Sequence, residues 1–150
     1  MKVSGRSIAL AVAGAALATG VLAAPATADG SQVSAVGTTT HIRGDGTQPP
    51  AELGNPTEWG VVELTMNDSA GSISPMTIVE IGGGTWSYGW YLTADGKYCY
   101  SNYYHHDVMH GSTAELGGSS IKHVVVAGEY SNAHLTGGAG YTCNAYYAKY

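Results

Sequence analysis

The sequence contains no phenylalanine and only two cysteines, and charged residues make up 11% of its 150 residues. Six Lys and Arg residues are outnumbered by eleven Asp and Glu residues, which gives a formal net charge of -5. Nucleic-acid binding requires clustered cations that neutralise phosphates, so this composition argues against a nucleic-acid partner. The sequence has one long apolar run, residues 8–24. We therefore expect no transmembrane segment in the mature chain.

The apolar run has the features of an export signal. Lys2 and Arg6 precede it, and two small-x-small sites follow within residues 24–28. A positive start, an apolar stretch and an A-x-A site are typical of a secretory signal peptide. A membrane anchor is the alternative, but the run is short and rich in small residues. We predict a signal peptide over residues 1–28 and a secreted, extracellular mature protein.

Glycine and the larger aromatic residues are abundant. The chain has 22 Gly, 11 Tyr and 3 Trp, and every Tyr lies between residues 88 and 150. Tyr and Trp favour strands, and Gly supplies turns with positive φ. No segment after the apolar run shows a helical period. This composition predicts an all-β protein.

Cys99 and Cys143 are the two cysteines. In an exported chain, two cysteines are first interpreted as one disulfide, here closing a loop of about 44 residues. Two independent thiols, or a bond to another chain, are the alternatives.

The segment before residue 82 divides into two parts. Residues 29–56 are rich in Gly, Ser, Thr and Pro, which predicts a flexible linker. Residues 59–66 and 76–81 are expected strands, with a turn over 67–74. Region 57–81 is interpreted as a β extension, as a pro-region or as part of the main domain.

The second half shows clearer strand signals. Residues 85–92 and 97–104 alternate large aromatic residues, and Asp95-Gly96 between them predicts a hairpin turn. Gly117-Gly118 marks another turn. Further strands are expected over 121–127, 129–134 and 141–148. Short strands at this spacing predict an antiparallel sandwich or small barrel.

The segment 105–110 (HHDVMH) is the densest polar cluster. His106 and His110 have the spacing of a helical zinc pair, but the preceding residues have a strand pattern. His105, Asp107 and His110 form an alternative strand-end metal set. The interpretation that we favour is a turn whose histidines hydrogen-bond locally, so we predict no metal and no cofactor.

The aromatic face of the hairpin is the candidate binding site, because Tyr and Trp are enriched at binding surfaces. Packing in the core is the competing interpretation, since a domain without Phe must use Tyr and Trp there. No nucleophile elbow or paired carboxylates stand out, so we expect no catalytic residues and no enzyme; a small hydrolase is the least favoured reading. The candidate binding residues are Trp86, Tyr88, Trp90, Tyr100, Tyr103, Tyr104, His105 and His110.

Five short segments occur in the order found in one bacterial protein family. They are 83–89 (GGTWSYG), 101–105 (SNYYH), 110–114 (HGSTA), 127–133 (AGEYSNA) and 145–147 (AYY). Together they resemble the lactococcin 972 family of bacteriocins over residues 82–150. The two cysteines, the long segment before Gly83 and the acidic charge depart from the family pattern.

The resemblance implies a small two-sheet antiparallel β-sandwich over 82–150. It also implies a secreted, non-enzymatic antibacterial protein that inhibits cell-wall synthesis or septum formation in competing bacteria. The implied partner is a cell-wall precursor, lipid II, or the cell surface of the target bacteria. The alternative function is a secreted wall-glycan-binding or structural β module without killing activity.

Overall fold

The computed structural model describes residues 37–65 and 76–150, all of which lie in one compact unit, Ser31–Tyr150. The predicted signal peptide (1–28) and the expected turn over 67–74 lie outside the described residues. None of the described helical segments is long and apolar enough to cross a membrane. The elements are β1 Thr39–Ile42, a 3-10 helix η1 Ala51–Leu53, β2 Glu58–Leu64, β3 Thr77–Ile81, β4 Gly84–Thr93, β5 Gly96–Tyr104, β6 His110–Leu116, β7 Ser119–Val125, β8 Tyr130–Gly137 and β9 Cys143–Lys149.

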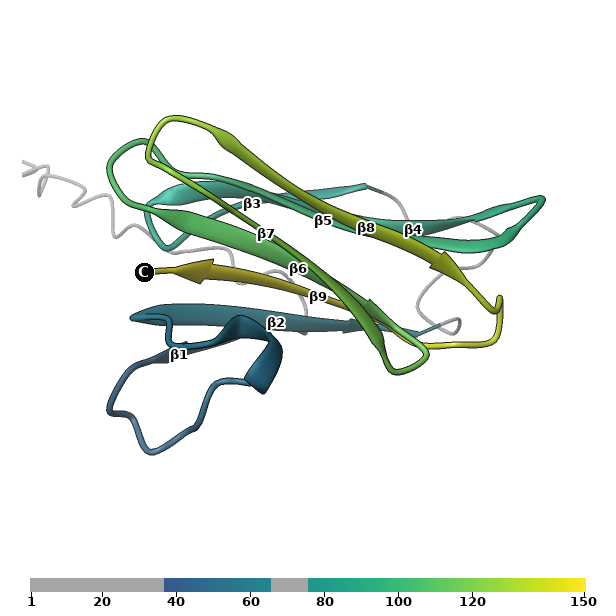
Figure 1. Ribbon diagram of the computed structural model, residues 1–150, viewed down its shortest axis with the longest axis horizontal. Helices are drawn as coiled ribbons and strands as arrows, with labels where there is room; N and C mark the ends of the chain where they lie inside the picture. Colours follow the sequence, from purple (N-terminus) through teal and green to yellow (C-terminus); the bar gives the residue numbers. More distant parts are fainter. Residues whose placement is uncertain (1–36, 66–75) are drawn as a thin grey trace, which may run out of the picture. The chain divides into compact units, whose positions relative to one another are not determined.

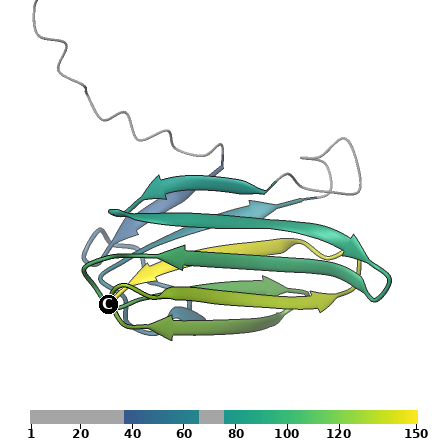
Figure 2. The ribbon, with the colours of Figure 1, turned by 90° about the horizontal axis from the view of Figure 1, so that it is seen from above.

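These strands form two antiparallel sheets. One sheet has the order β1-β2-β9-β6-β7, and the other has the order β3-β4-β5-β8. Figure 1 shows the four-stranded sheet above β9 and β2, and Figure 2 shows its strands side by side from above. The predicted all-β class and the two-sheet sandwich are confirmed.

The two turns predicted from glycine are present. Strands β4 and β5 pair from Thr93↔Gly96 at the turn to Thr85↔Tyr104 at the far end, with Gly96 at φ 127°. Gly117 and Gly118 have φ values of 61° and 80° between β6 and β7, a backbone that residues with a Cβ rarely adopt. Local turn chemistry therefore fixes the register of both hairpins.

Strand β6 was not predicted. His110 had been placed in a turn, whereas it is the first residue of this strand, which lies between β9 and β7. Six of its seven residues are buried, so both of its faces are covered. Small residues at 111–114 hide the period-2 pattern that marks a strand with one face in solvent.

The segment before residue 82 contributes to both sheets. Strand β2 pairs with β9 over seven residues, and β3 pairs with β4 over five. Two ordered elements, β1 and η1, lie within the expected linker, where Leu53 is buried against Trp59. Leu53 and Trp59 form a second apolar cluster with Tyr146 and Ala148, separate from the core between the sheets.

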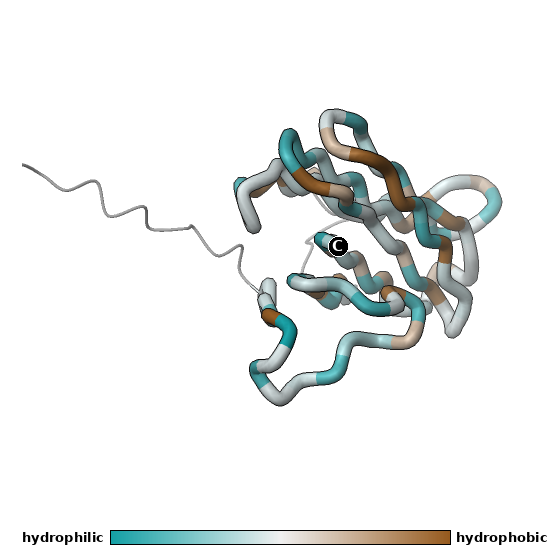
Figure 3. Tube along the Cα trace, turned by 60° about the vertical axis from the view of Figure 1, so that its left-hand side comes forward, coloured by the Kyte–Doolittle hydropathy of each residue, from teal (hydrophilic) through white to brown (hydrophobic). Residues whose placement is uncertain are grey.

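The core between the sheets is made largely of aromatic residues. Its largest side chains include Trp86, Tyr88, Trp90, Tyr103 and Tyr147. In Figure 3 strongly hydrophobic colour is confined to short stretches of the tube, since Trp and Tyr have intermediate hydropathy. Large aromatic side chains bury much area with few residues, which suits a chain without Phe.

The predicted disulfide between Cys99 and Cys143 is confirmed. It joins β5 of one sheet to β9 of the other, with the Cα atoms 5.7 Å apart, and both residues are fully buried. The bond therefore connects the two layers through the core.

Candidate functional site

Four of the candidate binding residues lie in the core. Trp86, Tyr88, Trp90 and Tyr103 are each at most 2% exposed. For these four residues the structure therefore agrees with the competing interpretation, which was packing in the core. Strand alternation correctly grouped Trp86, Tyr88 and Trp90 on one face, and that face points toward the other sheet. Leu92, the next residue of that series, is exposed near the hairpin turn.

The polar atoms of two of these core residues are satisfied internally. The indole Nε1 of Trp86 donates to Ser101 Oγ at 2.9 Å, and that hydroxyl donates to the carbonyl oxygen of Tyr146 at 2.7 Å. Tyr103 Oη donates to the carbonyl oxygen of Ile81 at 3.0 Å. These hydrogen bonds offset the cost of burying polar atoms, and the one from Ser101 to Tyr146 links the two sheets.

His105 and His110 are both buried and bonded locally. Nδ1 of His105 accepts hydrogen bonds from the backbone N–H groups of Asp107 and Val108, so the ring proton lies on Nε2, which donates to Gly82 O at 3.2 Å. His110 Nδ1 donates to Val108 O at 2.8 Å, and its Nε2 lies 2.9 Å from Glu129 O. The histidines therefore shape the 105–110 turn and the start of β6.

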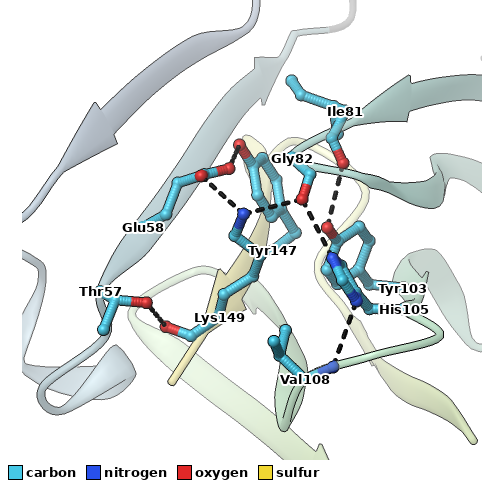
Figure 4. A network of polar contacts seen from close by, with 9 residues as sticks. All are labelled: Thr57, Glu58, Ile81, Gly82, Tyr103, His105, Val108, Tyr147 and Lys149. Atoms are coloured by element: carbon cyan, nitrogen blue, oxygen red, sulfur yellow. Dashed lines mark hydrogen bonds and ion pairs between the residues drawn. The ribbon is translucent and has the colours of Figure 1, made fainter. Parts of the chain in front are cut away.

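A polar network closes one end of the sandwich beside these histidines (Figure 4). Lys149 Nζ lies 2.7 Å from Glu58 Oε2 and donates to Gly82 O at 2.7 Å. Tyr147 Oη donates to the other oxygen of Glu58 at 3.0 Å. Gly82 O thus accepts hydrogen bonds from both Lys149 and His105. The network connects β2, β9 and the β3–β4 turn.

Lys149→Met is expected to lower the free energy of unfolding by about 2 kcal/mol, because it leaves a mostly buried carboxylate without its cation. Urea unfolding followed by circular dichroism measures the loss. The double variant Glu58→Gln/Lys149→Met removes both charges and should lose less than the sum of the two single variants. Additive losses would show that the ion pair contributes nothing.

No three His, Cys, Asp or Glu side chains come together to hold a metal ion within residues 37–65 and 76–150. His106 and Asp107 are strongly exposed, whereas His110 is buried. The spacing of His106 and His110 therefore does not place their rings together as a helix would. The turn interpretation agrees with the hydrogen bonds observed.

The exposed aromatic residues lie on the opposite side of the hairpin from the core. This outer surface of the four-stranded sheet is called the tyrosine face. Two candidate residues, Tyr100 and Tyr104, belong to it. The sequence reasoning missed its other aromatic members, although the alternation that directs Trp90 inward also directs Tyr91 outward. Its aromatic residues are Tyr91, Tyr98, Tyr100, Tyr104, Tyr130 and His134.

The rings of the tyrosine face form two groups. Tyr98 is stacked on Tyr91 with centroids 4.8 Å apart and on His134 with centroids 5.3 Å apart, at interplanar angles of 26° and 23°. Tyr100 completes this first group at 6.2 Å from Tyr98. In the second group, Tyr104 and Tyr130 have centroids 4.7 Å apart.

The tyrosine face has little charge. Burial raises the pKa values of the Tyr98 and Tyr100 hydroxyls, so both stay neutral at physiological pH. No Lys or Arg from the described ranges projects from it: Lys97 on β5 points inward and lies 4.6 Å from the Trp90 ring centroid. Glu80, at the β3 edge, accepts a hydrogen bond from Thr85. This face is therefore suited to neutral ligands.

A pocket of about 230 Å³ lies on the β1–η1 loop, with Arg43 and Trp59 in its lining. The Arg43 guanidinium donates to the carbonyl oxygens of Pro56 and Asn55, which ties it to the loop itself. Arg43 therefore has a structural role at this pocket.

The fold and the surface define a disulfide-bonded β-sandwich that presents an aromatic, nearly uncharged outer face. The sequence model of the lactococcin 972 bacteriocin family matches residues 82–147. This region contains β4 to β8 and most of β9, and the resemblance to the lactococcin 972 family is confirmed over these residues. No curated protein and no solved structure matches the chain significantly.

Proposed function

We propose that this protein is a secreted bacteriocin that inhibits cell-wall synthesis or septum formation in competing bacteria without acting as an enzyme. The family match over residues 82–147 carries the proposal. The intact sandwich and its internal disulfide support it, because a small cross-linked β domain is suited to work outside the cell.

Lipid II is the target to test first, as the family resemblance implies. The charge distribution makes this a demanding test. Of the cations within residues 37–65 and 76–150, Lys97 is buried and Lys149 is paired with Glu58. Arg43 is tied to its own loop, so a pyrophosphate group would have to rely mainly on backbone N–H donors or on Lys122.

Purified mature protein is expected to arrest growth of related bacteria at micromolar concentration and to produce cells with defective septa. Microscopy of treated cultures, with a fluorescent label for new wall, measures this effect. Protein that has been reduced and alkylated is the matched control, because it has the same composition without the Cys99–Cys143 bond. Normal growth and normal septa across a broad panel would contradict the antibacterial proposal.

The lipid II step has a separate readout. If lipid II is the target, adding the purified precursor to the growth assay should protect the cells in proportion to its amount. If the protein still kills the cells and added lipid II does not protect them, the bacteriocin proposal stands and lipid II is rejected as its target.

A further inference from the structure

The tyrosine face has a regular row structure set by strand register. Across β4, β5 and β8, the four rows are Tyr91–Tyr98–Thr136, Gly89–Tyr100–His134, Ser87–Asn102–Asn132 and Thr85–Tyr104–Tyr130. The third row contains only hydroxyl and amide side chains. It therefore separates the two aromatic groups with hydrogen-bonding residues.

Gly89 makes room for the Tyr100 ring at the centre of the first aromatic group. A Cβ at Gly89 would come within 2.8 Å of Tyr100 Oη and 3.1 Å of Cζ, so the Tyr100 ring lies over the glycine backbone. An aromatic ring over a cross-strand glycine presents a broad face to solvent. Tyr91 and Tyr98 stack on each other beside it, and their rings are tilted by 51° and 38° from the Tyr100 ring, so the group offers aromatic surface in more than one orientation.

The spacing of the two groups fits an extended ligand. Tyr100 and Tyr104 are four residues apart on β5, which corresponds to about 13 Å along the strand. A ligand that contacts both groups must therefore present flat apolar surfaces at both ends and polar groups between them. Asn102 and Asn132, in the row between, offer amide donors and acceptors for those polar groups.

Pyranose chains have this chemistry. Each sugar ring has a face of C–H bonds that stacks on an aromatic ring and a rim of hydroxyl groups that hydrogen-bonds. Tyrosine is well suited to such a surface because it combines a rigid apolar ring with a polar end at low entropic cost. The low charge of the face complements an uncharged polymer and gives no attraction to a phosphate or to an acidic peptide.

From these observations we propose that the tyrosine face binds an extended, uncharged polysaccharide, which on a bacterial surface is the glycan strand of the cell wall. This binding places the protein on the wall of a target cell. The proposed glycan binding does not depend on the proposed inhibition of wall synthesis. It is argued from the outer surface of β4, β5 and β8, whereas the inhibition is argued from the family match.

The test uses the full mature chain in pull-down assays on washed, purified peptidoglycan and on insoluble chitin, with soluble chitin oligosaccharides as competitors. The wild type should bind both polymers, and the oligosaccharides should release it. The double variant Tyr98→Ala/Tyr130→Ala, which alters both aromatic groups, should bind roughly tenfold more weakly or less. No living cells are used, so a negative growth assay leaves this result intact.

Control variants separate binding from folding. Tyr141→Ala removes a tyrosine that is 53% exposed, comparable to Tyr130 at 63%, but lies in the loop before β9 and away from the face. It should bind like the wild type. Tyr98→Leu retains apolar volume without a flat ring and should show the binding defect even if Tyr98→Ala does not fold.

Three results would overturn the proposal. The first is equal binding by the wild type and the Tyr98→Leu and Tyr130→Ala variants. The second is binding to lipid II in vesicles without binding to either polymer, which would assign the face to the precursor. The third is a stable dimer in sedimentation that the Tyr130→Ala variant abolishes, which would assign the face to a second copy of this chain.

Discussion

Replacing both Cys99 and Cys143 with alanine is expected to lower the free energy of unfolding by about 4 kcal/mol. The two residues are separated by 44 positions in the sequence and link the two sheets. The bond restricts the unfolded chain, and a loop of this length loses considerable entropy on closure. A small domain has a limited core, so a loss of this size is a large part of its total stability. Urea unfolding of both proteins gives the difference.

Two further proteins test the cause of this loss. Wild-type protein that unfolds in the presence of reductant should lose a similar amount, since it has the same atoms without the cross-link. The variant Cys99→Ser/Cys143→Ser should lose more than the alanine variant, because it buries hydroxyl groups at fully buried positions. A loss below about 1 kcal/mol in the alanine variant would show that the cross-link contributes little to stability.

The stability of the protein is expected to fall steeply above pH 10, by about 4 kcal/mol for each pH unit. Burial raises the pKa values of Tyr103, Tyr146 and Tyr147 well above the usual value of 10.0. Above pH 10 the unfolded chain loses the three phenolic protons while the folded protein retains them. The folded state then binds more protons than the unfolded state, so stability falls as pH rises.

The buried ammonium group of Lys97 changes the pH dependence of stability in the opposite direction at lower pH. Burial lowers the pKa of its ammonium group below 10.5, so the unfolded chain holds one more proton in the window between the lowered value and 10.5. Stability rises with pH through that window, and the tyrosines then dominate.

Urea unfolding at half-unit steps from pH 9 to pH 11.5 measures the alkaline slope. The variant Tyr103→Phe should reduce the slope by about 1.4 kcal/mol per pH unit, because one retained proton is removed. The comparison uses the slope, so the loss of the Tyr103 hydrogen bond to Ile81 changes only the offset. An unchanged slope in this variant would contradict the assignment.

Local patterns were sufficient to predict much of the fold. The β4–β5 hairpin follows from aromatic alternation and the Asp95-Gly96 turn, and the disulfide follows from two cysteines in a chain that is predicted to be exported. Strand β6 could not be found in this way. Six of its seven residues are buried, so it lacks the alternation on which such predictions depend.

The site was harder to predict because burial depends on which face of a strand meets the other sheet. Alternation separates Trp90 from Tyr91 but does not say which of them is covered. The larger Trp side chains were given the binding role, and the structure places them in the core. Which face is covered depends on where the second sheet packs. Strands β2 and β9, which form much of that sheet, come from opposite ends of the described chain.

The position of β9 has a consequence for how the protein is made. This strand lies between β2 and β6, and its residues 143–149 are the last strand of the described chain to be synthesised. The five-stranded sheet cannot close until they are available, and its β2–β9 pairing spans most of the domain in sequence. Folds dominated by such long-range contacts form slowly. A chain of this design is therefore expected to complete its five-stranded sheet only after its final strand has been synthesised.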